Sequence, residues 1–172
     1  METTVSIVIP LYNEEENVAQ LTERLSRAMD KIDGQVETII VDDGSTDSSW
    51  ELLKTAQAQD SRFKIIRLTR NFGQTPAMAA GFAAAQGHII VTLDADLQND
   101  PADIPKILNK MKEGFDVVSG WRKNRKDKLS RKFSSRAANS LISWMTGARL
   151  HDTGCTLKAY KSSVIKNLNI YG

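Results

Sequence analysis

Two aspartates, Asp94 and Asp96, follow an apolar run in the stretch VTLDADLQNDP at residues 91–101 and are the first candidates for chemistry. In an extended segment alternate side chains share a face, so both carboxylates are expected on one side and Ala95 and Leu97 on the other. Two carboxylates that close repel each other unless a proton or a cation lies between them. The spacing therefore predicts a divalent-metal site, and the alternative is a pair of turn and capping residues at a strand end.

A metal ion in this chain would be bound mainly by oxygen atoms, because the chain contains only one cysteine and two histidines. This composition excludes an internal disulfide and a His-rich zinc site. The expected metal is Mg²⁺ or Mn²⁺, held by Asp94, Asp96 and the phosphate oxygens of a substrate. Gln98 is expected on the same face in the same register and is included as a metal ligand, with a solvated loop side chain as the alternative.

A second acidic motif, VDDGSTD at residues 41–47, follows another apolar run. Gly44 permits the backbone turn that would direct Asp42 and Asp43 into a cleft. Carboxylates at strand ends accept hydrogen bonds from a base or a ribose in nucleotide folds. Taken alone, the motif is also a common turn with Asp47 as a helix cap. The chain has no GxGxxG pattern and no Walker loop, which argues against dinucleotide and P-loop chemistry.

The elements that must position these residues alternate along the chain. Apolar, β-branched runs predict strands buried on both faces at residues 5–11, 36–41, 63–68, 88–93 and 115–119. Helices are expected between them: one with Asn13 as N-cap and Glu16 at the capping-box position, then 48–57 behind Asp47, 75–86, and 101–112 behind Asp100. Further along, the expected elements are a helix at 129–145, a strand at 155–160 and a short terminal helix.

This alternation predicts an α/β fold with a mainly parallel sheet and helices on both of its faces, in which ligands bind beyond the carboxyl ends of the strands. Polar stretches follow each of the first five strands in turn: YNEEE, DDGSTD, RNFGQ, DADLQ and GWRKNRK. At 172 residues and 41% hydrophobic content, the chain fits a single globular domain. It contains no run of about 18 apolar residues and no secretory signal, so the piece is expected to be soluble.

Basic residues are concentrated in residues 121–136, WRKNRKDKLSRKFSSR, which carry eight Lys or Arg and one acid. The chain has a net charge of +2, so this segment is +7 and the remainder is −5. Such a segment suits phosphates or anionic lipid head groups and favours contact with a membrane surface. A solvated basic face is the alternative. Nucleic acid is disfavoured as a partner, because few aromatic residues interrupt the run.

Five motifs in order resemble those of the family 2 glycosyltransferases, which have the GT-A fold: VSIVIPLYNEEENV, IIVDDGSTDSS, GHIIVTLDADLQNDP, SGWR and HDTGCTLKAYK. Within that family they are most similar to the polyprenyl-phosphate glycosyltransferases, the group of dolichol-phosphate mannose synthase and the bacterial undecaprenyl-phosphate glucosyl- and mannosyltransferases. The resemblance covers nearly the whole chain. The Q-x-x-R-W motif of processive members is missing, which disfavours polymer synthesis.

The resemblance implies roles for individual residues on the donor side. The residues implied to bind the nucleotide-sugar are Pro10, Tyr12, Glu14, Asp42, Asp43, Asp94, Ala95 and Asp96. Tyr12 would lie near the base, and Asp43 is favoured over Asp42 for the base edge. Asp94 and Asp96 would be the family's D-x-D pair, with Asp96 the firmer metal ligand.

On the acceptor side, Arg122 of SGWR and Arg136 of SSR occupy the places of arginines that bind the acceptor phosphate in the family, and Arg131 is counted with them. Arginine suits this role because its fork of donors matches phosphate. Asp152 resembles the family's acidic residue near the acceptor. It would be a general base for a hydroxyl acceptor or would orient an ionised phosphate acceptor, and a turn residue is the alternative. Cys155 is expected to be a small buried residue and not a nucleophile.

The predicted function is that of a metal-dependent, inverting hexosyltransferase, which moves a hexose from a UDP- or GDP-sugar to a polyprenyl phosphate at the cytoplasmic face of the membrane. Alternatives are transfer to a saccharide hydroxyl in cell-wall or surface polysaccharide synthesis, a nucleotidyltransferase, and a nucleotide-binding module without catalysis. A homo-oligomer is left open. The family usually continues beyond the point where this chain stops, at NLNIYG, so a piece truncated before further soluble residues and membrane helices is expected.

Overall fold

The computed structural model describes residues 3–121 and 155–165. Their strands form one six-stranded sheet in the order β3-β2-β1-β4-β6-β5. The strands are β1 (Thr3–Leu11), β2 (Gln35–Asp42), β3 (Phe63–Arg67), β4 (Ile89–Thr92), β5 (Val117–Ser119) and β6 (Lys158–Lys161). Strands β3, β2, β1 and β4 are parallel to one another. Strand β6 lies between β4 and β5 and is antiparallel to both. The predicted mainly parallel sheet is confirmed, with one antiparallel strand inserted beside β4.

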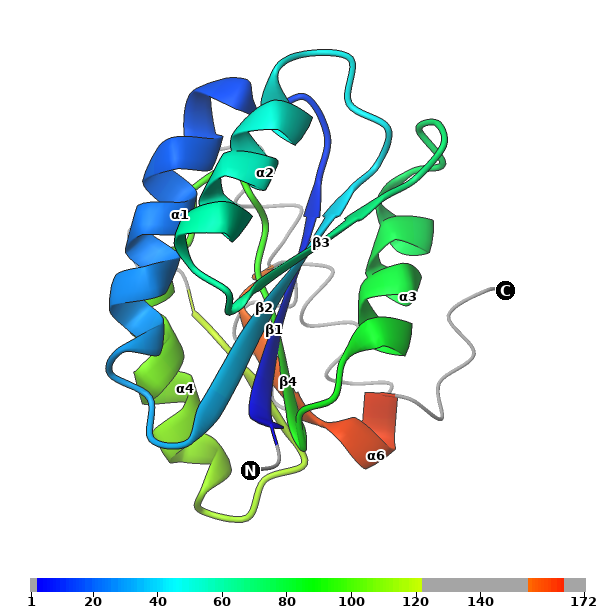
Figure 1. Cartoon of the computed structure of the whole chain (residues 1–172). Helices are drawn as coiled ribbons and strands as arrows, with labels where there is room; N and C mark the ends of the chain where they lie inside the picture. Colours follow the sequence, from blue (N-terminus) through cyan, green and yellow to red (C-terminus); the bar gives the residue numbers. More distant parts are fainter. Residues whose placement is uncertain (1–2, 122–154, 166–172) are drawn as a thin grey trace, which may run out of the picture.

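Helices cover both faces of the sheet, as Figure 1 shows: α1, α2 and α4 lie on one face and α3 and α6 on the other. Their bounds are α1 (Glu15–Met29), α2 (Ser49–Gln59), α3 (Gln74–Ala84), α4 (Ile104–Met111) and α6 (Ser162–Ile165), with a 3-10 turn η1 (Pro101–Asp103) before α4. Each helix predicted within the described residues is present. Asp100 is the predicted cap, since its Oδ1 accepts a hydrogen bond from the backbone N–H of Ala102 at 3.0 Å.

The buried hydrophobic residues form two clusters, one on each face of the sheet, because successive side chains of β1 point to opposite faces. Ile7 and Ile9 pack with α1 and α4 on one face, while Val8 packs with Ile39 and α3 on the other, and all are fully buried. Burying one such side chain contributes about 1.5–3 kcal/mol, so this double-sided burial is the main reason that the sheet forms here. Gly81 lets α3 approach β1 closely, because a Cβ at that position would overlap the side chain of Val8.

The start of α1 differs from the sequence prediction. Asn13 is not its N-cap; the cap is Glu14, and Asn13 has a φ of 51°. The Asn13 Oδ1 atom instead accepts a hydrogen bond from the N–H of Thr46 at 2.9 Å. The first N–H groups of α1 are bound across the loop, where Ser49 Oγ accepts from Glu14 and Asp47 Oδ2 accepts from Glu15. A long-range cap has replaced the local one, because the loop after β2 lies against this helix start.

This capping is reciprocal. Glu15 Oε2 accepts a hydrogen bond from the N–H of Ser48 at 2.9 Å, and Asp47 Oδ1 accepts from the N–H of Ser49 at 3.0 Å. Acceptor oxygens at each helix start thus satisfy N–H groups that the helix itself leaves unpaired. The loops after β1 and β2 are fixed to each other at the carboxyl edge of the sheet.

Several predictions lie outside the described residues. These are the helix at 129–145, nearly all of the basic segment 121–136, and the acceptor-side residues Arg122, Arg131, Arg136 and Asp152. Within the described residues, no helix has the length and apolar character needed to span a membrane. The predicted strand at 155–160 corresponds to β6, and Cys155 is buried as expected.

Candidate active site

A cavity of about 290 Å³ opens at the carboxyl edge of the sheet. It is enclosed by the segments that follow β1, β2, β3 and β4, and by the first turn of α3. Its lining residues are Pro10, Leu11, Tyr12, Glu14, Asp43, Asn71, Gly73, Gln74, Ala77, Asp94, Ala95 and Asp96. Ligands of parallel α/β sheets bind at this edge, so the cavity is the candidate donor pocket.

The cavity brings together most of the residues predicted for nucleotide-sugar binding. Seven of them line it: Pro10, Tyr12, Glu14, Asp43, Asp94, Ala95 and Asp96. The Tyr12 side chain is 41% exposed, which leaves its ring available to a ligand. Asp42 and Gln98 are not among the lining residues. The ligand-binding roles themselves stay predictions, and the structure shows only that these side chains share one cavity.

Asp42 is fully buried and is not among the residues that line the cavity. Its Oδ1 accepts a hydrogen bond from the N–H of Ser45 at 2.9 Å, and its Oδ2 lies 3.2 Å from Nε of Arg67. The Arg67 guanidinium in turn lies over the ring of Trp50. The carboxylate of Asp42 therefore holds the turn after β2 against β3, and this placement gives no support to its predicted contact with a nucleotide.

Asp43 lines the cavity but is only 3% exposed. Its two carboxylate oxygens accept hydrogen bonds from the N–H groups of Phe72 and Gly73, each at 2.8 Å. Charge-assisted bonds of this kind are among the stronger hydrogen bonds in proteins. Asp43 thus fixes the loop after β3, in addition to any role toward a ligand.

The geometry after β4 differs from the predicted extended segment. The strand ends at Thr92, the chain turns, and Leu97 has a φ of 58°. Asp94 and Asp96 still line the same cavity, as predicted, while Ala95 both lines it and belongs to the buried core, against which Leu97 packs.

Gln98 was predicted on the same face as the two aspartates, and its role as a metal ligand stays a prediction. The Gln98 side chain is exposed and lies outside the cavity, because the left-handed residue Leu97 ends the alternation on which the prediction depended. The N–H of Gln98 donates a hydrogen bond to Asp96 Oδ1 at 3.1 Å, so its backbone contacts the acidic pair.

The described lining residues include four acids, Glu14, Asp43, Asp94 and Asp96, and no Lys or Arg. Carboxylates in this number attract a cation and disfavour a diphosphate unless a cation accompanies it. Among the described residues there is no cluster of three or more His, Cys, Asp or Glu side chains in position to hold a metal alone. Two carboxylates fit Mg²⁺ or Mn²⁺ when phosphate oxygens complete the coordination, which is the usual arrangement for these ions.

The sequence prediction assigned no role to several lining residues. Asn71, Gly73 and Gln74 come from the stretch RNFGQ, whose position after the third strand marked it as part of the same edge. The Gln74 side chain contacts the acidic pair directly, because its Nε2 donates a hydrogen bond to Asp94 Oδ1 at 2.9 Å. The polar stretch RNFGQ was the only signal in the sequence that these residues belong to the site. The contact between Gln74 and Asp94 joins residues 20 positions apart, so the sequence near Gln74 does not indicate it.

A parallel sheet that carries an acidic cavity at its carboxyl edge is the architecture of the GT-A glycosyltransferases. The chain belongs to glycosyl transferase family 2, whose family model matches residues 6–168. The resemblance inferred from its motifs is therefore confirmed at the level of the family.

Curated relatives share nearly half of the residues. The chain is 46% identical over 171 residues to dodecaprenyl-phosphate galacturonate synthase of Rhizobium johnstonii, covering 98% of this chain and 51% of the relative. It is 46% identical over 165 residues to undecaprenyl-phosphate 4-deoxy-4-formamido-L-arabinose transferase of Salmonella choleraesuis, covering 95% of this chain and 50% of the relative. The chain thus spans about half the length of these relatives.

Solved structures show the same fold. Glucosyl-3-phosphoglycerate synthase from Mycobacterium tuberculosis, in complex with Mn²⁺, UDP and glucosyl-3-phosphoglycerate, superposes with a TM-score of 0.75 at 20% identity, covering 96% of this chain and 59% of that chain. TarS of S. aureus, residues 1–349, gives a TM-score of 0.65 at 20% identity, covering 95% of this chain and 48% of that chain. The predicted GT-A fold is confirmed.

Proposed function

We propose that this chain acts as an inverting glycosyltransferase, which moves a sugar from a UDP- or GDP-sugar to a polyprenyl phosphate. The observation that carries the proposal is the acidic cavity at the carboxyl edge, which gathers Asp94 and Asp96 with Tyr12 in a family 2 chain. The names of two relatives at 46% identity refer to dodecaprenyl phosphate and undecaprenyl phosphate, which supports this class of acceptor.

On the donor side, Asp94 and Asp96 would hold Mg²⁺ or Mn²⁺ together with the diphosphate of the donor. The bound ion supplies positive charge against the charge that develops on the leaving diphosphate. The presence of Mn²⁺ and UDP in the mycobacterial structure supports a divalent ion in this fold. The half-exposed ring of Tyr12 offers an apolar face to the base, and Pro10 and Glu14 complete that side of the cavity.

The relatives do not agree on the sugar. One carries galacturonate in its name and the other a formamido-arabinose. A hexose remains the proposed cargo, and the four acids of the cavity disfavour a negatively charged sugar close to them unless a basic group accompanies it.

On the acceptor side, Arg122, Arg131 and Arg136 would bind the phosphate of the lipid, and Asp152 would orient it. The acceptor phosphate is already ionised at neutral pH, so no general base is needed for its attack on the anomeric carbon. One displacement at that carbon inverts its configuration. The basic segment 121–136 would hold the protein at the cytoplasmic face of a membrane, since each basic residue contributes about 1 kcal/mol near anionic lipids.

The test is transfer of labelled sugar from UDP- and GDP-sugars to undecaprenyl phosphate, with Mg²⁺ or Mn²⁺, by the wild type and by Asp96→Asn. We expect the variant to lose at least about 100-fold in rate, because removal of charge stabilisation at a leaving group costs several kcal/mol. Asp103→Asn is the matched control, since Asp103 is a nearby carboxylate that pairs with Lys106 outside the cavity.

Two outcomes would contradict the proposal. Turnover of Asp96→Asn near that of the wild type would exclude the acidic pair as the donor site. Transfer to a free saccharide acceptor but not to undecaprenyl phosphate would favour the hydroxyl-acceptor alternative, in which Asp152 becomes a general base.

A further inference from the structure

A continuous set of contacts joins the acid after β2 to the acid after β4. Asp43 accepts hydrogen bonds from the N–H groups of Phe72 and Gly73, both at 2.8 Å. The next residue, Gln74, donates from Nε2 to Asp94 Oδ1 at 2.9 Å. Two motifs that are 51 positions apart in sequence are therefore connected through one loop and one side chain.

The loop in this connection is fixed at its backbone. Besides the two bonds to Asp43, it lies against Gly44, where a Cβ would come within 2.5 Å of the carbonyl carbon of Arg70 and 2.9 Å of the nitrogen of Asn71. Gly44 has a φ of +70° and Gly73 a φ of +97°, a region that glycine adopts readily. The loop is consequently held in one path by contacts at both of its ends.

Gln74 starts α3 from this fixed loop and is itself exposed. Its backbone position is therefore set by Asp43 and the helix, while its side chain is free of dense packing. A carboxylate is an acceptor only, so the amide must present its NH₂ group to Asp94.

An amide has a property here that a basic side chain lacks. It orients the carboxylate of Asp94 through a hydrogen bond without cancelling its charge. Lysine in the same place would form an ion pair with Asp94 and compete with the metal. Partners that orient a ligating carboxylate in this way typically change metal affinity about 10–100-fold when removed.

We propose that Gln74 is a positioning residue, which orients Asp94 for binding the metal–diphosphate unit, and that Asp43 acts through it by fixing the loop at residues 70–73. This inference rests on the proposed function, because it assumes that Asp94 takes part in holding the ion. It assigns the second acid of VDDGSTD a role in building the metal site, beside the predicted contact with the base.

The experiment measures Mn²⁺ binding by the intensity of the free-ion electron paramagnetic resonance signal, with Mn²⁺ alone, with UDP and with GDP. Wild type, Gln74→Leu, Asp94→Asn and the double variant form a cycle. Thr75→Val is the matched control, since Thr75 is exposed in the same helical turn but does not line the cavity.

We expect Gln74→Leu to weaken Mn²⁺ binding in the presence of the nucleotide about tenfold. In the Asp94→Asn background the same substitution should change binding by less than about twofold, because its target is already gone. The melting temperature without metal should move by less than about 2 °C in Gln74→Leu, as for other exposed substitutions. Thr75→Val should match the wild type in both measurements.

The outcomes separate the two proposals. If Asp94→Asn binds Mn²⁺ and nucleotide as the wild type does, the metal site of the proposed function is wrong and the inference is wrong with it. If Asp94→Asn loses binding but Gln74→Leu does not, or if Gln74→Leu weakens binding equally in both backgrounds, only the inference is overturned.

Discussion

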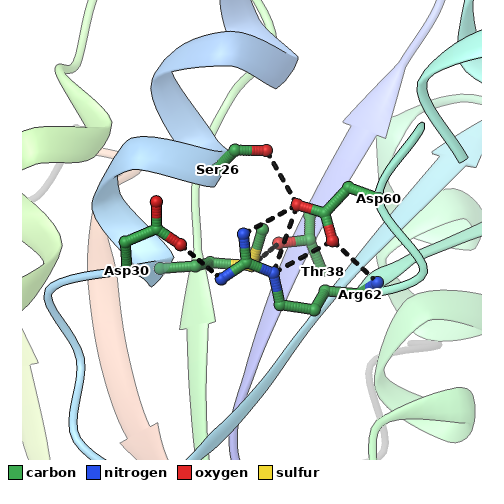
Figure 2. A network of polar contacts seen from close by, with 6 residues as sticks. Ser26, Asp30, Thr38, Asp60 and Arg62 are labelled. Carbon is green, nitrogen blue, oxygen red and sulfur yellow. Dashed lines mark hydrogen bonds and ion pairs between the residues drawn. The ribbon is translucent and has the colours of Figure 1, made fainter.

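Two groups of acidic side chains in this molecule differ in what neutralises them. At the carboxyl edge of the sheet, the cavity is lined by four acids with no basic residue among the described lining residues. At the opposite edge, Asp30 and Asp60 lie at the ends of α1 and α2 and share one arginine, Arg62 (Figure 2). Both groups are acidic, and in the second the described residues include the cation that pairs with them, Arg62.

The paired group is complete within the fold. The Arg62 guanidinium contacts Asp60 and Asp30 at 2.8 Å each, and Ser26 Oγ donates to Asp60 Oδ2 at 2.9 Å (Figure 2). Hydrogen bonds from Arg62 are the largest cause that lowers the pKa of Asp60, from 3.8 to about 2. The same pairing raises the pKa of Arg62. This group fastens α1, α2 and the start of β3 to one another.

The Arg62 group stabilises the fold, whereas the acids of the cavity are the ones proposed to bind a metal and a donor. A carboxylate that is paired internally contributes to folding and has no reason to bind anything further. Carboxylates gathered close to one another repel, so contacts that hold them in place favour the fold. Asp43 and Gln74 provide such contacts in the cavity.

The largest expected effect is that of metal removal on the cavity acids. Dialysis against EDTA should lower sugar transfer by at least about 100-fold, because the ion supplies several kcal/mol of charge stabilisation. The melting temperature measured without nucleotide should stay the same, since the Arg62 group needs no ion. Re-addition of Mn²⁺ or Mg²⁺ should restore the rate. If protein verified to be free of metal transferred sugar at the undiminished rate, the cavity acids would not act through a metal ion, and this prediction would be wrong.

An intermediate effect is expected from Arg62→Leu, which leaves Asp30 and Asp60 without their cation. We expect a loss of about 2 kcal/mol in the free energy of unfolding, as for other charged hydrogen bonds that are partly shielded from solvent. Urea denaturation would measure it, and the nucleotide-dependent binding of Mn²⁺ should remain unchanged. A variant that is as stable as the wild type would show that this cluster does not fasten the helices.

The smallest effect is the acid dependence of that same group. The folded-state pKa of Asp60 is lower than its ordinary value of 3.8, so its contribution to stability is present above about pH 4 and is lost as the pH falls toward 2. We expect about 1 kcal/mol from this source, seen as the difference between wild type and Asp60→Asn in urea denaturation at pH 6 and at pH 3. Parallel pH profiles of the two proteins would contradict it.

Much of the architecture could be predicted because its cause is local. The runs at β1, β2 and β4 are apolar on both faces, which indicates strands under two layers of helices. Polar residues after each strand had to meet at one edge, so Tyr12, Asp43 and Asp94 were correctly brought together.

The errors concern contacts between segments that are distant in sequence. Asn13 was predicted to be the N-cap of α1, whereas side chains of the loop after β2 accept the hydrogen bonds at this helix start. Gln98 was placed by strand alternation, which the left-handed Leu97 interrupts. Gln74 received no role, because nothing in its neighbourhood shows that its partner lies 20 positions away. Alternation and propensity describe one segment at a time, whereas these contacts depend on where two loops meet.

The antiparallel strand β6 has a consequence for how such a protein can diversify. The N–H of Gly120 donates to the carbonyl of Leu157 at 2.8 Å, and Thr92 Oγ1 donates to the carbonyl of Thr156 at 2.7 Å. The two ends of the segment that joins β5 to β6 are therefore anchored by hydrogen bonds at Gly120 and at Thr156 and Leu157. With both anchors fixed, doubling the length of the intervening chain adds only about 0.6 kcal/mol of closure entropy. The length of the chain between these two anchors can therefore change at little cost to the sheet that carries the cavity residues.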